Sequence, residues 1–175
     1  MERVLVLGSS GSGKSTFAQA LSDITGIPMV SLDALFWKPG WVESDHAEFE
    51  TRVTAAASQP RWIMDGNYTA SGAGELRRSI ADTVFWFDLP RLTCMTGILT
   101  RIVKTYGEVR PEMAPGCPEK IDFEFFRYVW SYRRVQRPKQ LVYLEGLRSD
   151  QALVRFTKRT QADRYLSNAR AEQVH

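Results

Sequence analysis

The chain has 175 residues, of which 43% are hydrophobic and 25% are charged; this is the composition of an ordinary globular domain, long enough for a full core. Its net charge of +3 suits anionic ligands but is too small to indicate nucleic-acid binding by itself. Its two cysteines are too few for a disulfide framework, no apolar run reaches the length of a membrane span, and the start lacks a signal-peptide pattern. We therefore expect a single cytoplasmic domain over residues 1–175, monomeric or homodimeric, with no membrane segment.

Short apolar runs alternate with helical segments along the chain, which is typical of βαβ units and of a parallel sheet. The expected strands cover residues 4–7, 29–32, 61–64, 84–87 and 141–144. The expected helices cover residues 14–24, 44–58 (with Ser44 as N-cap), 74–80, 90–104 and 119–137, and a last one begins at residue 149. Residues 105–118 carry several prolines and glycines and are expected to form a loop. Residues 161–175 are a polar tail, expected either to extend the last helix or to fray.

The first expected strand leads directly into Gly8-Ser9-Ser10-Gly11-Ser12-Gly13-Lys14-Ser15, with Thr16 next. These residues match the phosphate-binding pattern G-x-x-x-x-G-K-[ST], in which glycines let several backbone N–H groups point at phosphate oxygens. In that pattern Lys14 supplies a charge for the β- and γ-phosphates and the Ser15 hydroxyl can ligate Mg²⁺. A Gly/Ser-rich turn before a helix is the alternative, but the apolar strand immediately before the motif favours a nucleotide site.

Three acidic residues follow expected strands of the sheet, at the edge where ligands bind in parallel sheets. Asp65, followed by Gly66, is expected to hold Mg²⁺ beside Ser15, although Asp-Gly is also a turn dipeptide. Asp33 is expected to position an acceptor hydroxyl or to accept its proton, or else to cap the next helix. Asp88 is either close to the nucleotide or an N-cap.

Taken in this order, the P-loop, Asp33, Asp65-Gly66 and residues 87–90 resemble the adenylate kinase-like P-loop kinases, a branch that includes shikimate and gluconate kinases. Residues 32–41, 65–68 and 111–119 are similar, more specifically, to the bacterial group labelled DNA topology modulation proteins. The resemblance implies an α/β, three-layer P-loop NTPase fold. Its five-stranded parallel sheet would have the order 2-3-1-4-5, with helices on both faces and a helical lid at about residues 101–137.

The resemblance also implies roles for residues that contact the nucleotide. Arg101 would lie against the adenine, and Gly146 belongs to the loop whose backbone contacts that base. Arg127 and Arg134 would act on the phosphoryl group during transfer, with Arg110 as a further candidate. Residues 101–137 carry eight basic and five acidic residues, an excess that fits closure over a polyanion, although a solvated basic helix face is the alternative.

The acceptor is expected beyond the second and third strands. The residues expected to bind it are Asp33, Trp37, Asn67, Tyr68 and Arg77; the arginine is implied by the resemblance, with Arg78 as the alternative. The tryptophan could stack on a base or a sugar, or could serve only in packing. The residue types are compatible with a nucleoside, a nucleotide or a polyol.

The leading hypothesis is an ATP- and Mg²⁺-dependent phosphotransferase that moves the γ-phosphoryl group to a small hydroxyl- or phosphate-bearing acceptor. Its catalytic residues would be Lys14, Asp33, Arg127 and Arg134, and ATP is favoured over GTP as donor. One alternative is a nucleotide-regulated protein associated with nucleic acid, although the sequence has no helix-turn-helix, zinc finger or separate basic domain. Another is a simple NTPase without an acceptor.

Overall fold

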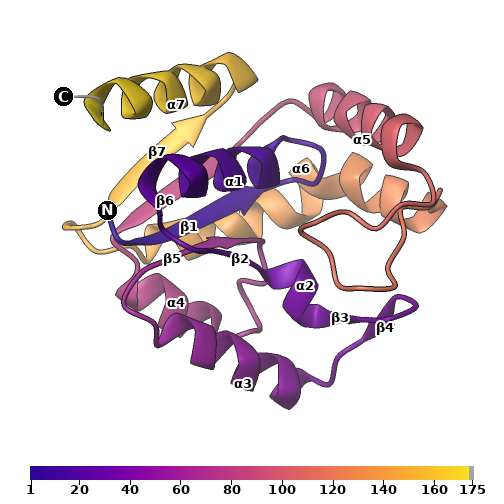
Figure 1. The fold of residues 1–175 in the computed structure, drawn as a ribbon, viewed down its shortest axis with the longest axis horizontal. Helices are drawn as coiled ribbons and strands as arrows, with labels where there is room; N and C mark the ends of the chain where they lie inside the picture. Colours follow the sequence, from indigo (N-terminus) through magenta and orange to yellow (C-terminus); the bar gives the residue numbers. More distant parts are fainter. Residues whose placement is uncertain (174–175) are drawn as a thin grey trace.

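In this computed structural model, which describes residues 1–173, a parallel sheet of five strands runs through the centre of the molecule (Figure 1). Its strands are β1 (Arg3–Gly8), β2 (Met29–Ser31), β5 (Trp62–Asp65), β6 (Thr83–Phe87) and β7 (Ala152–Phe156). They lie in the order β2-β5-β1-β6-β7. Counted within this sheet alone, the order is the expected 2-3-1-4-5.

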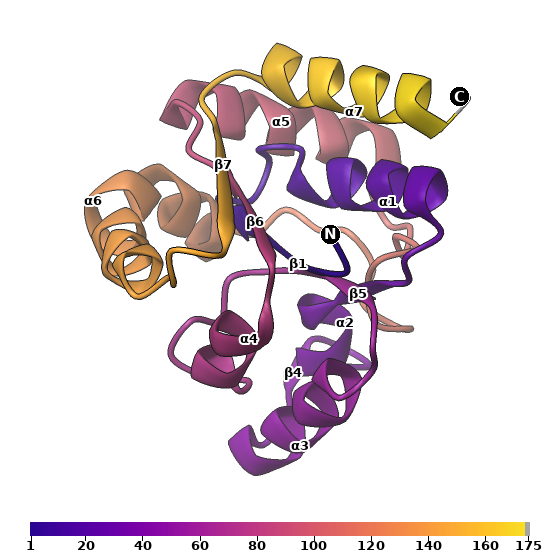
Figure 2. The ribbon, with the colours of Figure 1, turned by 90° about the vertical axis from the view of Figure 1, so that its left-hand side faces the viewer.

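Helices cover both faces of the sheet, so that the fold has three layers (Figure 2). On one face lie α1 (Lys14–Thr25), α5 (Arg91–Thr105) and α7 (Arg159–Gln173); on the other lie α3 (His46–Ala57), α4 (Gly74–Ile80) and the end of α6 (Phe123–Glu145). Successive side chains of β1 point to opposite faces of the sheet, and both faces are apolar. Val4 and Val6 pack on the side of α1, whereas Leu5 and Leu7 pack on the side of α3. The expected α/β class is confirmed.

The fifth strand is not where the sequence analysis places it. Residues 141–144 belong to the last turns of α6, and the strand is β7 at Ala152–Phe156. The last helix accordingly begins at Arg159 rather than at residue 149, and takes up most of the expected polar tail; residues 174–175 lie outside the described part. Pro138 lies inside α6 on its exposed side, where water can solvate the carbonyl that loses its hydrogen bond to a proline.

Between β2 and α3 the chain forms three short elements for which the sequence analysis gives no bounds. A short helix, α2 (Leu32–Phe36), leads into an antiparallel hairpin of β3 (Trp37–Lys38) and β4 (Val42–Glu43). The N-cap of α3 is Asp45, whose carboxylate accepts hydrogen bonds from the backbone N–H groups of residues 47 and 48. The prediction of Ser44 as the cap is therefore wrong by one residue.

The segment 106–122 between α5 and α6, called here the lid loop, packs on this hairpin. Its residues Met113, Ala114 and Cys117 form a small apolar cluster with Trp37 and Trp41. The Gly40 N–H donates to the Gly116 carbonyl (2.8 Å), and Trp41 Nε1 donates to the Pro118 carbonyl (3.1 Å). No helix within residues 1–173 has the length and apolarity to cross a membrane.

Candidate functional site

The P-loop connects β1 to α1 and has the backbone geometry of an anion cradle. Gly8, Gly11 and Gly13 have φ angles of 145°, 74° and 98°, which are values that residues with a Cβ rarely adopt. Within the described residues, the first turn of α1 has no side-chain cap and no acidic residue. Its backbone N–H groups are therefore available, at the positive end of the helix, to a phosphate group.

Lys14 is nearly buried and lies next to two oxygen-bearing side chains. Its Nζ is 3.0 Å from Asp65 Oδ1 and 3.5 Å from Ser15 Oγ. Burial lowers the pKa of the Lys14 ammonium and the charge of Arg110 adds to that effect, but the negative charges of Asp65 and Asp33 outweigh both, so that the pKa is raised overall. Lys14 therefore carries its charge at neutral pH, where it can meet a phosphate.

Register places Asp65 beside the P-loop, because its partner in the neighbouring strand β1 is Val6, two residues before the P-loop begins. Asp65 and Ser15 thus approach one ammonium group from two elements. Oxygen ligands of this kind suit Mg²⁺, which ordinarily keeps several waters and takes further oxygens from phosphates. These residues fit the predicted magnesium site.

Asp33, in α2, and Tyr68, in the loop after β5, contact each other through their side chains. The Tyr68 hydroxyl donates to Asp33 Oδ1 (2.8 Å), and burial, followed by the charge of Asp33, raises the pKa of that hydroxyl. Asp33 does not cap α2, because the cap is Ser31, whose Oγ accepts from the Ala34 N–H (3.2 Å). The carboxylate of Asp33 is left with oxygen lone pairs for a further ligand.

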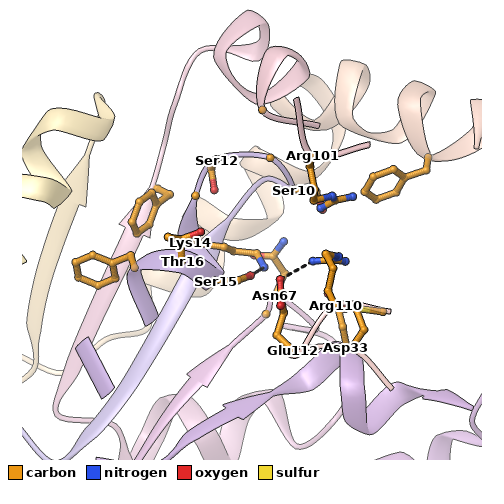
Figure 3. A pocket seen from close by; sticks show the side chains of 18 of the residues that line it. Ser10, Ser12, Lys14, Ser15, Thr16, Asp33, Asn67, Arg101, Arg110 and Glu112 are labelled. Atoms are coloured by element: carbon orange, nitrogen blue, oxygen red, sulfur yellow. Dashed lines mark hydrogen bonds and ion pairs between the residues drawn. The ribbon is translucent and has the colours of Figure 1, made fainter. Parts of the chain in front are cut away.

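Most of the predicted site residues line one cleft of about 940 Å³ (Figure 3). The predicted residues that line it are Ser10, Gly11, Ser12, Gly13, Lys14, Ser15, Thr16, Asp33, Trp37, Asn67, Tyr68 and Arg101. Gly8 and Ser9 lie at the buried start of the P-loop, and Asp65 lies under Lys14. The nucleotide-binding and acceptor-binding halves that the sequence predicts are therefore parts of a single cavity.

Four predicted residues do not lie at this cleft. Arg77 is fully buried and donates hydrogen bonds to the carbonyls of residues 67, 68 and 72, so it shapes the loop after β5 rather than facing a ligand. Gly146 ends α6 and lies against Arg78, away from the P-loop. Arg127 and Arg134 lie on the exposed face of α6 and do not line the cleft.

Other charged side chains line the cleft instead, from the lid loop, α6 and the segment after β7. They are Arg110, Glu112, Glu119, Lys120, Asp122, Lys139, Arg159 and Asp163. Arg159 Nη2 donates to the carbonyls of Gly11 (2.6 Å) and Thr93 (3.1 Å), so this side chain joins the P-loop to α5. Sequence reasoning missed Arg159 because it placed the fifth strand too early; a strand at 152–156 would have put Arg159 at the ligand-binding edge.

Asp88 serves neither of the roles considered for it. Its carboxylate accepts hydrogen bonds from Arg137 Nε (2.8 Å) and Arg155 Nε (3.0 Å), and α5 begins after Pro90 without a side-chain cap. Burial raises the pKa of Asp88, but the hydrogen bonds and charges of the two arginines outweigh burial and lower it overall. Asp88 thus joins β6, α6 and β7.

No family model matches the chain, and no curated protein matches it either. Several solved structures are similar in fold. A shikimate kinase from Acinetobacter baumannii, in complex with shikimate, is 14% identical with a TM-score of 0.59, covering 100% of this chain and 96% of that chain. A gluconokinase from Sinorhizobium meliloti 1021 is 19% identical with a TM-score of 0.54, covering 97% of this chain and 90% of that one. A sugar kinase from Janibacter sp. HTCC2649 is 18% identical with a TM-score of 0.51, covering 97% and 92%.

These likenesses extend over nearly the whole chain and over nearly the whole of each neighbour. At such low identities they show a shared fold. The chain has the α/β fold of small-molecule kinases with a P-loop.

Proposed function

We propose that this chain is a Mg²⁺- and ATP-dependent kinase that phosphorylates a small acceptor bearing a hydroxyl or a phosphate group. The observation that carries the proposal is that the P-loop and Asp33, which comes 18 residues after Ser15, line one cleft of the size that small-molecule ligands occupy. A donor triphosphate on Lys14 and an acceptor on Asp33 would then face each other inside it. The named kinases of similar fold favour the same class of reaction.

The three segments that carry the resemblance to the DNA topology modulation group support this site as well. Residues 32–41, 65–68 and 111–119 come from α2 and the β3–β4 hairpin, the loop after β5 and the lid loop. Each contributes residues to the cleft: Asp33 and Trp41 from the first, Asn67 from the second and Glu112 from the third. We infer that what this group has in common is a ligand pocket.

In the proposed reaction, the P-loop N–H groups and Lys14 hold the β- and γ-phosphates of ATP. The acceptor hydroxyl forms its bond to the γ-phosphorus while the bond from phosphorus to the β,γ-bridging oxygen breaks, and ADP leaves. Asp33 accepts the proton of that hydroxyl, and Tyr68 keeps the carboxylate in place through its hydrogen bond. Mg²⁺ held by Ser15 and Asp65 would neutralise charge on the phosphates.

The arginines of the cleft would stabilise the charge that spreads over the transferring phosphoryl group. Arg110 and Arg101 line the cleft, whereas Arg127 and Arg134 do not. We therefore assign to Arg110 the role first expected of the α6 arginines. An arginine in this role can contribute ~10³–10⁵ in rate.

The test is a calorimetric titration of the purified chain with Mg²⁺·ATP and with Mg²⁺·GTP, followed by a screen of nucleosides, nucleotides and polyols for ATP-dependent phosphorylation. We expect binding of ATP, transfer to at least one acceptor class, and no transfer by Lys14→Ala. The variant Lys104→Ala, which changes an exposed lysine of α5, should behave as the unmodified chain. Absence of nucleotide binding would refute the proposal, and hydrolysis that no acceptor alters would instead support a simple NTPase.

A further inference from the structure

One buried carboxylate in the lid loop is shared by two arginines of the cleft. Glu119 Oε1 lies 2.9 Å from Arg101 Nη2, and Glu119 Oε2 lies 2.9 Å from Arg110 Nε. The side chain of Glu119 is only 5% exposed. Arg101 comes from α5 and Arg110 from the lid loop, so this carboxylate joins two elements that carry cations into the same cavity.

The position of Glu119 is itself fixed by its backbone and by its neighbour. The Glu119 N–H donates to the Glu108 carbonyl (2.8 Å), and the Glu119 carbonyl accepts from the Gly107 N–H (2.9 Å). The carbonyl of Pro118, one residue earlier, accepts from Trp41 Nε1 of the hairpin (3.1 Å). The carboxylate therefore has a rigid base, whereas each arginine is a long side chain that needs an anchor.

The two arginines keep donors free for a ligand. Arg110 uses Nε for Glu119 and Nη1 for Glu112 Oε1 (2.7 Å), and its Nη2 makes no hydrogen bond within residues 1–173. The Arg101 guanidinium lies 5.6 Å from the centre of the Phe125 ring. Figure 3 shows both arginines on the same side of the cleft, across from Lys14. Glu119 thus engages one nitrogen of each guanidinium, and Arg110 Nη2 and Arg101 Nε are left without a hydrogen bond in the described part of the chain.

We propose that Glu119 is a positioning residue that holds Arg101 and Arg110 in place for the donor nucleotide. This inference rests on the proposed function, because it assumes that ATP occupies the cleft. An arginine whose planar guanidinium is anchored loses less side-chain freedom when it binds phosphate than a free one. Glu119 makes no contact with the phosphates in this scheme; it acts through the two arginines.

The experiment compares Glu119→Gln with Glu108→Gln by calorimetric titration with Mg²⁺·ATP. Glu108 is in the same loop, its side chain is exposed, and it forms no ion pair within the described chain, so the same chemical change there is a matched control. We expect Glu119→Gln to bind Mg²⁺·ATP about 10–100-fold more weakly, the range seen when partners that orient the ligands of a bound ion are removed. Glu108→Gln should bind as the unmodified chain does.

A second measurement separates positioning from loss of structure. An irreversibly misfolded fraction lowers the stoichiometry of the titration and leaves the dissociation constant of the folded fraction unchanged, whereas reversible unfolding raises the apparent dissociation constant only by the inverse of the folded fraction, which urea denaturation of Glu119→Gln measures. Arg110→Ala should also weaken binding much less in the Glu119→Gln background than alone, because the arginine has already lost its anchor. Glu119→Asp keeps the buried charge but is one methylene too short to reach both arginines, and it should weaken binding too.

The outcomes distinguish the two proposals. Equal ATP affinity of Glu119→Gln and Glu108→Gln, or independent effects of Glu119→Gln and Arg110→Ala, would overturn the positioning role and leave the proposed function standing. Failure of the unmodified chain to bind Mg²⁺·ATP would overturn both.

Discussion

The side-chain amide of Asn67 forms two hydrogen bonds with the backbone of Gly8, the first residue of the P-loop. The Gly8 N–H donates to Asn67 Oδ1 (2.9 Å), and Asn67 Nδ2 donates to the Gly8 carbonyl (3.0 Å). Gln140 of α6 also donates to Asn67 Oδ1 (3.2 Å). Because Tyr68 follows Asn67 and holds Asp33, a single pair of neighbouring residues joins the nucleotide and acceptor sides of the cleft.

Asn67→Asp tests this joint. A carboxylate can still accept from the Gly8 N–H but cannot donate to the Gly8 carbonyl, and it brings two oxygens into repulsive contact. We expect a loss of about 1–3 kcal/mol in the free energy of unfolding and weaker binding of Mg²⁺·ATP, measured by urea denaturation and calorimetry. Asn168→Asp, an exposed change on α7, serves as control; equal behaviour of the two variants would show that the joint is unimportant.

Tyr68→Phe tests the hydrogen bond that holds Asp33. The ring and its packing remain, so the affinity for Mg²⁺·ATP should stay unchanged, while kcat falls about tenfold, or about 1.4 kcal/mol in activation free energy. Asp33→Asn should lower kcat by about 10²–10⁴ if Asp33 accepts the proton. Steady-state kinetics with the acceptor found by screening measures both effects, and near-normal turnover of Asp33→Asn would remove Asp33 from the reaction.

Gly11→Ala tests how closely the P-loop packs on α5. Gly11 has a φ of 74°, and a Cβ there would overlap the Cys94 carbonyl oxygen. Gly26→Ala is the matched control, since its φ is 66° and no heavy atom lies within 4 Å of the added Cβ. The control should lose only the cost of a left-handed residue, about 1–2 kcal/mol. Gly11→Ala should lose more and also bind ATP poorly; equal losses in thermal denaturation would contradict this packing.

Because of Asp88, the free energy of unfolding should fall when the solution is made acidic. Its pKa is lowered in the folded chain, so the stabilisation from this carboxylate is complete above its unfolded pKa of about 3.9 and is lost as the pH falls through the lower folded value. We expect Asp88→Asn to lose about 1.5–3 kcal/mol at pH 7, and the difference from the unmodified chain to shrink below about pH 4.

Urea denaturation at pH 7, 5 and 3 measures this dependence on Asp88. Asp150→Asn removes an exposed partner of Arg148 and should change little, because exposed ion pairs contribute little. A difference between Asp88→Asn and the unmodified chain that stays constant down to pH 3 would contradict the assignment.

The parts of the site that the sequence could predict are those that local patterns determine. The P-loop is contiguous, Asp33 lies just after β2 and Asp65 is the last residue of β5, so the topology of a parallel sheet brings them together without further information. Asn67 and Tyr68 come two and three residues after Asp65. Both side chains line the cleft, where the sequence analysis expects the acceptor.

The misplaced fifth strand shows where local patterns are insufficient. Residues 141–144 are apolar and follow Pro138, so they read as a strand, but Tyr143 and Leu144 are buried as part of a helical face that also buries Gln140. The true strand β7 lies at the edge of the sheet and is partly exposed, and its hydrophobic signal is accordingly weaker. The sequence analysis places Gly146 in a nucleotide-binding loop after a strand at residues 141–144; because these residues are helical, Gly146 ends α6 instead.

The arginines of the lid could not be assigned from the sequence for a different reason. Arg127 and Arg134 are seven residues apart and so share one face of α6, and which face turns to the cleft depends on how the helix packs. Arg110 lies in a loop with no periodicity, and only the fold brings it to Glu119.

The two buried cysteines give the protein a built-in chemical reporter. Cys117 is 1% exposed where the lid loop packs on the hairpin, and its thiol donates to the Lys38 carbonyl (3.2 Å). Cys94 is equally buried, but inside the main core. A thiol reagent can reach Cys117 only after the lid loop separates from the hairpin, whereas labelling of Cys94 requires the core to open. The ratio of the two labelling rates therefore compares how often the lid loop opens with how often the whole domain unfolds, and it needs no introduced probe.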